Sequence, residues 1–195
     1  ATLVTLNTTD TGIVATTDMI TVTMAAASTS AADLNTIDGK TGVAVGATAI
    51  TELTGTASAI TTALASSGIT TVTNSTLAVK VDNGTATVSQ INTINGDSAT
   101  GKLTATVSES DAATLVTLNT TDTGIAATTD MITVTMAAVS TSATDLNTID
   151  TKTGVTVGAM AITELTGTAT SIATAVASTG INTSSTYNVL ITSGT

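Results

Sequence analysis

The hydrophobic and polar positions of the chain follow two periods that alternate along the sequence. At 20–24, 77–81, 103–107 and 132–136 apolar residues alternate with other residues, which is typical of half-buried β-strands. Between these segments an apolar-x-Thr-apolar group recurs, as in Leu34-Asn35-Thr36-Ile37. The pattern predicts short strands that alternate with short helical turns.

Two segments carry the signals of short helices. One begins at Ser30, three positions before Asp33 as in a capping box, and Gly39 stands where a C′ glycine would end it. The other lies at 56–68, with Gly68 as its expected stop. Three apolar residues share one face of this second helix: Ala57, Ile60 and Leu64. Because threonine and serine are weak helix formers, we expect only one or two turns in each.

The chain is internally repeated. Residues 1–69 and 113–181 align without a gap at a period of 112, and 58 of these 69 positions are identical. A shorter period lies within the longer one, because the apolar anchor recurs about every 28 residues. The first residues of the seven anchors are at positions 3, 34, 60, 91, 115, 146 and 172. We interpret 1–195 as one array of about seven units of 24–31 residues, with a super-repeat at 1–112 and a truncated copy at 113–195. Duplication of an ordinary domain of 112 residues is the alternative.

These units predict a mainly all-β fold. A unit with one narrow apolar face cannot bury it alone, but stacked units can. We therefore expect a repeat β-solenoid with short helical turns in each coil, whose strands keep every ladder donor because the chain has no proline. Tandem β-sandwich domains are the alternative, since about eight strands per 112 residues would also fit. Because Ala1 opens in the middle of a repeat, we expect the chain to be a piece of a longer protein.

Composition excludes several functions. The chain has no Cys and no His, which removes disulfide frameworks, thiol chemistry and ordinary zinc or haem sites. Its net charge of -10, without a single Arg, argues against binding nucleic acid or a basic membrane-surface role. No apolar run is long enough to span a bilayer, so we expect no membrane insertion. A serine nucleophile would lack a His partner, and we expect no enzymatic activity.

Three strings resemble a known class of repeat: DLNTIDGKTG (33–42), ITELTGTAS (50–58) and ALASSGIT (63–70). They resemble the Thr/Ala-rich tandem repeats of giant cyanobacterial surface or secreted proteins, which carry LNT-(I/L)-DG-x-T, LTGTA and ASSGI blocks. The first string is also similar to the AELNxLDG repeats of phage tail fibres. Both resemblances imply long, extracellular, non-enzymatic rods or fibres, and neither supplies catalytic residues.

The acidic residues offer two site hypotheses. Asp33 and Asp38, repeated as Asp145 and Asp150, are the nearest approach to a catalytic carboxylate pair, although caps and turns also explain residues that recur in every super-repeat. Calcium is the better hypothesis for the acids, because many of them lie in Thr/Asn/Gly-rich turns. The calcium candidates are Asp38, Asp82, Asp97 and Asp150, with Asp10, Asp18, Asp122 and Asp130 in similar turns. No EF-hand or β-roll nonapeptide is present, and Asx turns explain these aspartates without an ion.

Threonine pairs of the form T-x-T suggest a third possibility. A flat array of such pairs, one per coil, could order water and bind ice. The pairs lie at 21/23, 71/73, 85/87, 104/106 and 133/135. Their spacing does not follow the repeat, and outward-facing strand residues of good β-propensity explain them as well.

The sequence therefore predicts a structural protein without a cofactor. We expect it to form or extend an extracellular filament, sheath or surface layer, and its partner to be itself, as a head-to-tail homopolymer or as the continuation of a longer chain. The low charge and high Thr and Ser content favour an extracellular or cell-surface location. The alternatives are an adhesin stalk that spaces a binding head and an ice- or calcium-binding rod.

Overall fold

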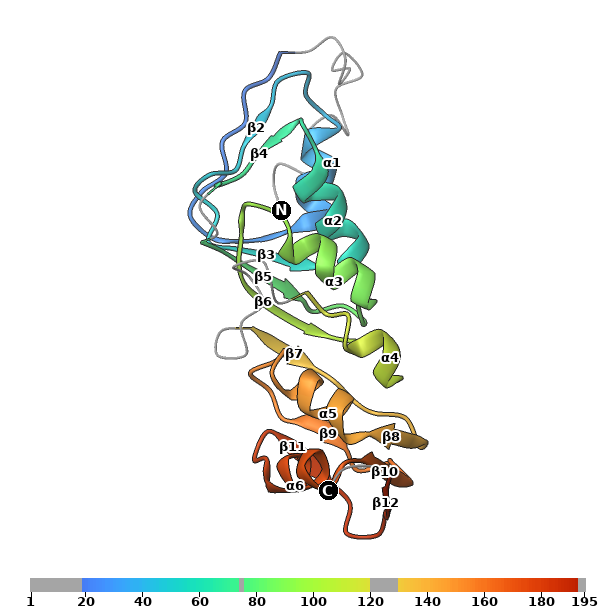
Figure 1. Ribbon diagram of the computed structural model, residues 1–195. Helices are drawn as coiled ribbons and strands as arrows, with labels where there is room; N and C mark the ends of the chain where they lie inside the picture. Colours follow the sequence, from blue (N-terminus) through green and yellow to red (C-terminus); the bar gives the residue numbers. More distant parts are fainter. Residues whose placement is uncertain (1–18, 74–75, 120–129, 193–195) are drawn as a thin grey trace.

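The computed structural model describes residues 19–73, 76–119 and 130–192, in which short strands and short helices alternate along an elongated molecule (Figure 1). The described helices are α1 (Ala31–Asp38), α2 (Ala57–Ala65), α3 (Val88–Asn95), α4 (Ala112–Leu115), α5 (Ala143–Asp150) and α6 (Ala169–Ala177). The described strands are β1 (Ser28–Ser30), β2 (Val45–Gly46), β3 (Glu52–Gly55), β4 (Ile69–Thr70), β5 (Leu77–Val81), β6 (Thr100–Thr106), β7 (Met131–Thr133), β8 (Ser140–Ser142), β9 (Val157–Ala159), β10 (Glu164–Gly167), β11 (Ile181–Thr183) and β12 (Asn188–Ile191).

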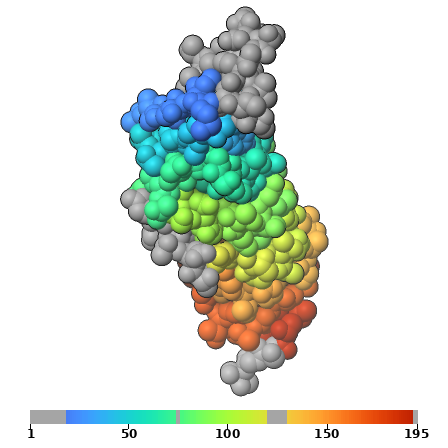
Figure 2. All heavy atoms as spheres, turned by 90° about the horizontal axis from the view of Figure 1, so that it is seen from above, coloured from blue at the N-terminus to red at the C-terminus, as the bar shows by residue number. Residues whose placement is uncertain are grey.

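All strand pairs in the described ranges are parallel. The largest sheet has the order β1-β3-β5-β6-β7, a second has β12-β10-β8, and two smaller sheets pair β2 with β4 and β9 with β11. Within them Ser28 lies opposite Glu52, and Glu164 lies opposite Asn188. Parallel strands need a crossover connection, and here the connecting chain contains a helix. This holds for the pairs β1-β3, β3-β5, β5-β6, β8-β10 and β10-β12. The units consequently follow one another along the long axis, as the order of colours shows in Figures 1 and 2.

The prediction of a mainly all-β solenoid is wrong. The structure is mixed α/β with small parallel sheets, and of the described residues about as many lie in helices (28%) as in strands (29%). The tandem β-sandwich alternative is also wrong, because sandwiches are built from antiparallel sheets. The error came from giving too much weight to the poor helix propensity of threonine. Most helical stability in proteins comes from packing an apolar face, and the anchors supply such a face with apolar residues three positions apart.

The N-terminal cap of α1 is the one predicted from the sequence, whereas the predicted glycine stops at the C-terminal ends of α1 and α2 are not confirmed. The Ser30 side chain accepts a hydrogen bond from the backbone N–H of Asp33, as predicted. Gly39 caps the C-terminus with φ of −67°, so its backbone is right-handed helical and does not need glycine. Helix α2 ends before Ser66, so Gly68 is not its stop. On its buried face Ala63 takes the place that we assigned to Leu64, which is only partly buried.

Helix α3 has the most complete cap in the described chain. The Thr87 side chain accepts from the N–H of Gln90, and the Gln90 side chain accepts from the N–H of Thr87. This reciprocal arrangement is a capping box, and it satisfies two backbone donors that a helix start leaves free. The T-x-x-Q sequence at 87–90 is the usual signal of a capping box, although from the sequence we considered Thr87 only as a member of the 85/87 threonine pair.

The anchor residues form the core on the helical side. Leu34, Ile60, Ile91, Leu115 and Leu146 all lie in helices and are completely buried. Ile172 in α6 is 8% exposed, and the anchor at position 3 lies outside the described residues.

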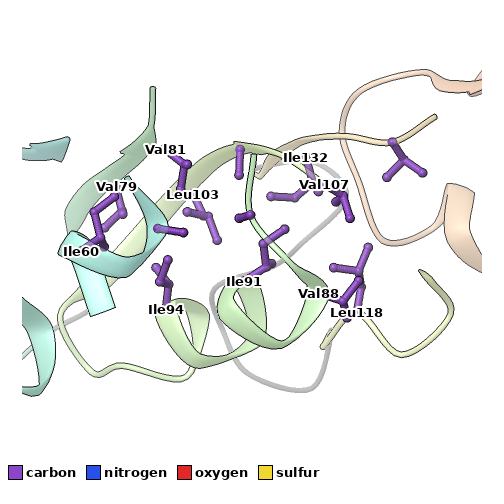
Figure 3. Packing of buried hydrophobic residues seen from close by; sticks show 14 of the residues in the cluster. Ile60, Val79, Val81, Val88, Ile91, Ile94, Leu103, Val107, Leu118 and Ile132 are labelled. Atoms are coloured by element: carbon purple, nitrogen blue, oxygen red, sulfur yellow. The ribbon is translucent and has the colours of Figure 1, made fainter. Parts of the chain in front are cut away.

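The strands supply the other side of the core. In β5 the residues Leu77, Val79 and Val81 are buried while Lys80 is exposed, which confirms the predicted alternation. Figure 3 shows Ile91 and Ile94 of α3 pointing toward the strand residues Val81 and Leu103. Burying a side chain of this size stabilises the fold by about 1.5–3 kcal/mol. The interior is thus a continuous row of aliphatic residues between helices and sheets.

Candidate functional site

The structure contains a repeated hydrogen-bonded contact between consecutive units. At the end of α1, the Asp38 carboxylate accepts a hydrogen bond of 2.8 Å from the Ser66 hydroxyl, which follows α2. The same Ser66 Oγ accepts a hydrogen bond from the N–H of Gly68 (3.1 Å). A Cβ atom at Gly68 would overlap the Asp38 carboxylate, with Cγ at 2.8 Å and Oδ2 at 3.0 Å. The φ of Gly68 is not in the positive region, so glycine is favoured here by the close approach of the carboxylate and not by the backbone conformation.

The second copy repeats this contact. The Ser178 hydroxyl donates to the Asp150 carboxylate (2.7 Å), and the N–H of Gly180 donates to Ser178 Oγ (3.0 Å). We call the two sets, Asp38/Ser66/Gly68 and Asp150/Ser178/Gly180, the Asp–Ser–Gly latches. Each latch joins segments 28 positions apart and thereby fixes the stacking of one unit on the next.

Two further side-chain types join neighbouring units. The Thr41 hydroxyl donates to the carbonyl of Ile20, and Thr153 donates to that of Ile132, both at 2.6 Å. An asparagine in three of the helices donates to a backbone carbonyl of the next unit at 3.0 Å. These bonds are Asn35 to Ala59, Asn92 to Thr117 and Asn147 to Ser171. Sequence analysis missed these residues, although their identity at a spacing of 112, as for Thr41 and Thr153, was a usable signal.

The predicted carboxylate pairs serve as structural contacts. Asp33 and Asp145 stand in the first turns of α1 and α5, and their N–H groups bond the capping serines. Asp38 and Asp150 belong to the latches at the other ends of the same helices. In each of α1 and α5, one aspartate of the predicted pair therefore belongs to the N-terminal cap and the other to the latch at the C-terminal end. They do not form a cleft with two facing acids.

The calcium candidates do not converge. Asp82 is exposed, and Asp97 accepts a hydrogen bond of 2.8 Å from the N–H of Ala99, as in an Asx turn. Asp130 is completely buried and accepts from the N–H of Leu103 (2.7 Å). Among the described residues no three His, Cys, Asp or Glu side chains lie together as a metal site would require. The candidates Asp10, Asp18 and Asp122 lie outside the described residues.

The threonine pairs do not make a regular face. Thr106 lies opposite Thr133, but Thr104 lies opposite Met131. Thr135 and Thr23 each lie opposite a glycine, Gly158 and Gly46 respectively. Where the pairs lie in or beside strands, mixed neighbours therefore interrupt the threonine array that we considered for ice binding.

An open groove of about 500 Å³ lies between α3 and α4. Among the described residues of its lining one side chain is titratable, Glu109, whose carboxylate accepts from the N–H of Val88 at the start of α3 (3.1 Å). Nearby, Asp111 caps α4, and the N–H of Thr114 lowers the pKa of its carboxyl. Both acids stabilise helix N-termini, where four backbone N–H groups have no helical partner. The groove offers no pair of groups for acid–base chemistry.

The last described strand, β12, presents an open edge. It pairs with β10 on one side, and in the part of the chain that the structure describes no strand pairs with its other side. Its apolar side chains are uncovered: Val189 is 53% exposed, Leu190 48% and Ile191 59%. Strand β5 pairs with the matching strand of the first copy, β3, and its Val79 is only 1% exposed because β6 lies on it. We call β12 the open edge.

Comparison with protein-family models, curated proteins and solved structures gives no match to this chain. In the described ranges none of the helices has the length and apolar character that crossing a membrane demands. The contacts between units and the open edge are therefore the features of this chain that bear on its function.

Proposed function

We propose that this chain is a structural repeat protein that forms or extends an extracellular filament, sheath or surface layer by stacking its units and pairing its strands. The observation that carries the proposal is the open edge. Three consecutive apolar residues of β12 are exposed, and within the described ranges no strand pairs with its outer side, so another parallel strand could pair there. Because these side chains are already about half buried, covering one would contribute about half of the roughly 1.5–3 kcal/mol that full burial of an exposed side chain gives.

The rest of the molecule supports this function. Its repeated polar contacts, the latches and the asparagine bonds, all join one unit to the next. The absence of Cys and His leaves few groups for catalysis. The resemblance of its repeat strings to those of giant surface proteins and of tail fibres favours an extracellular, mechanical role. We therefore propose that the partner of this protein is a further copy of the repeat.

Sedimentation velocity over a wide concentration range tests the proposal. The full chain should associate as its concentration rises, and electron microscopy of concentrated samples should show thin rods. Val189→Lys should weaken association, because a charge on the open edge would have to be buried. Val139→Lys is the matched control, since Val139 is 49% exposed and lies between β7 and β8, away from the open edge. A chain that stays monomeric at every concentration contradicts the proposal.

A further inference from the structure

The two copies of the repeat have identical residues at one end but different exposure. Residues 19–24 and 131–136 have the same sequence, MITVTM. In the second copy Ile132 is completely buried and Met136 is 2% exposed, whereas Ile20 and Met24 are only partly buried. Met131 is 41% exposed and its counterpart Met19 is 76% exposed. We call residues 19–24 the N-terminal face.

The residues that cover the second copy belong to the unit before it. Strand β6 pairs with β7, so that Ala105 lies opposite Ile132. The N–H of Val107 donates to the carbonyl of Thr133 (3.0 Å). Further along, the N–H of Ala137 donates to the carbonyl of Ser110 (2.9 Å). The described residues of the first copy, which begin at Met19, contain no counterpart of residues 105–110.

The apolar residues of the N-terminal face are the same in the two copies, as are most positions of the repeat. In the described parts of the repeat, ten positions differ between the two copies, and not one of these residues is buried in either copy. Met19, Ile20 and Met24 are identical to their counterparts although they are more exposed. In the second copy β6 pairs with the strand that begins at the counterpart of Met19.

We propose that the N-terminal face receives the open edge of a second copy of this chain, in a parallel, head-to-tail contact of the same kind as the β6–β7 pairing. This inference rests on the proposed function and names the two surfaces that meet. The two surfaces lie at opposite ends of the molecule in Figure 1, so a contact between them joins different molecules and can be repeated without closing.

The distribution of charge supports this partner. The chain carries a net charge of -10, which opposes association of two copies. However, residues 19–32 contain no charged side chain, and neither do residues 165–195. The nearest acid in the sequence is Asp18, which directly precedes the N-terminal face. Its counterpart Asp130 is buried and accepts a hydrogen bond from the N–H of Leu103 in β6, so the proposed contact must supply Asp18 with a similar donor.

Alternation along the strands restricts the register. Val189 lies opposite the buried Leu165, and Ile191 lies opposite Gly167, so both face the same side of the sheet as the core. Ile20 must then lie opposite Val189 or Ile191, because a shift by one residue would turn it to the other face. In the first register Leu190 lies beside Thr21, and in the second it lies beside Met19.

Cysteine cross-linking tests the contact, because the natural chain has no cysteine. Three single variants are needed: Leu190→Cys, Thr21→Cys and Met19→Cys. All three side chains are exposed, and circular dichroism should confirm that each variant keeps its fold. The Leu190→Cys protein is mixed with each of the other two, one partner carrying a tag so that mixed dimers resolve on a gel, and a short bismaleimide is added.

The expected result is a mixed dimer that exceeds both homodimers several-fold in one of the two mixtures. A chain that carries both cysteines should give a ladder of multimers. If Leu190→Cys links mainly to itself while sedimentation still shows association, the open edge pairs with its own copy. That result overturns this inference and leaves self-association intact. If the wild-type chain does not associate at all, the proposed function fails as well.

Discussion

Replacing Gly68 by alanine tests whether the latches hold consecutive units together. The new Cβ would overlap the carboxylate of Asp38, which must then turn away and release the Ser66 hydroxyl. The backbone at Gly68 does not require glycine, so the substitution introduces no conformational strain of its own. The predicted effect therefore comes from the carboxylate alone.

The magnitude follows from two opposing terms. A hydrogen bond to a charged group contributes about 1.5–3 kcal/mol, and the partial exposure of Asp38 reduces this to about 1–2 kcal/mol. Alanine also stabilises by about 0.4–1 kcal/mol, because it restricts the unfolded chain. Gly68→Ala should thus lower the free energy of unfolding by up to ~1.5 kcal/mol. In an Asp38→Ala background the same substitution should raise it by about 0.4–1 kcal/mol.

Urea unfolding followed by far-ultraviolet circular dichroism measures these changes, since the chain lacks Trp and has one Tyr. The double-mutant cycle should give a coupling energy of about 1–2 kcal/mol between Gly68 and Asp38. Gly39→Ala is the control, because a Cβ there would meet its nearest atoms at an ordinary 3.6 Å. Gly180 and Asp150 allow the same cycle in the second copy. Equal effects of Gly68→Ala in both backgrounds would refute the latch.

Three further predictions concern the core, pH and metal. Leu146→Ala should lower the free energy of unfolding by about 2–5 kcal/mol, whereas Val176→Ala on the exposed face of α6 should change it little, as urea titration will show. The lowered pKa of Asp111 means that its cap stabilises the fold above the ordinary carboxyl pKa of 3.8 and is lost as pH falls through the lower folded value. Asp111→Asn should flatten that acid limb of a stability–pH curve, and an unchanged limb would contradict the cap. Chelation should leave the melting temperature unchanged, because the described acids are dispersed, and a large drop in EDTA that calcium reverses would show a metal site.

Local signals in the sequence predicted local structure well. The cap at Ser30 needs only a hydroxyl group three residues before a backbone N–H that has no helical partner. Both groups lie within one short segment, so the sequence alone shows them. Alternation at 77–81 and 132–136 gave the buried face of each strand, because side chains point to opposite sides of a sheet. In residues 20–24 the alternation persists, but the structure forms only one bridge there, at Thr23.

Contacts between distant segments could not be predicted in the same way. The sequence around Asp38 is that of an ordinary turn and gives no sign of Ser66 and Gly68, which contact Asp38 only in the folded structure. The all-β expectation failed for a related reason, because a Thr-rich segment has weak helix propensity by itself and becomes helical when its apolar face packs. The calcium hypothesis was inferred from turn composition, and it stays a prediction, because coordination requires acids that converge from separate turns.

The two copies of the repeat show where the sequence is the same and where it differs. In the described residues the core and the latches are the same in both copies, and the differences lie at exposed or half-buried positions such as 44/156 and 48/160. A close-packed interior makes each core substitution costly, so two copies of one unit differ where packing is absent. The apolar residues of the N-terminal face are retained although they are not in the core of their own copy. If another strand packs there, as proposed above, the same packing requirement applies to these residues.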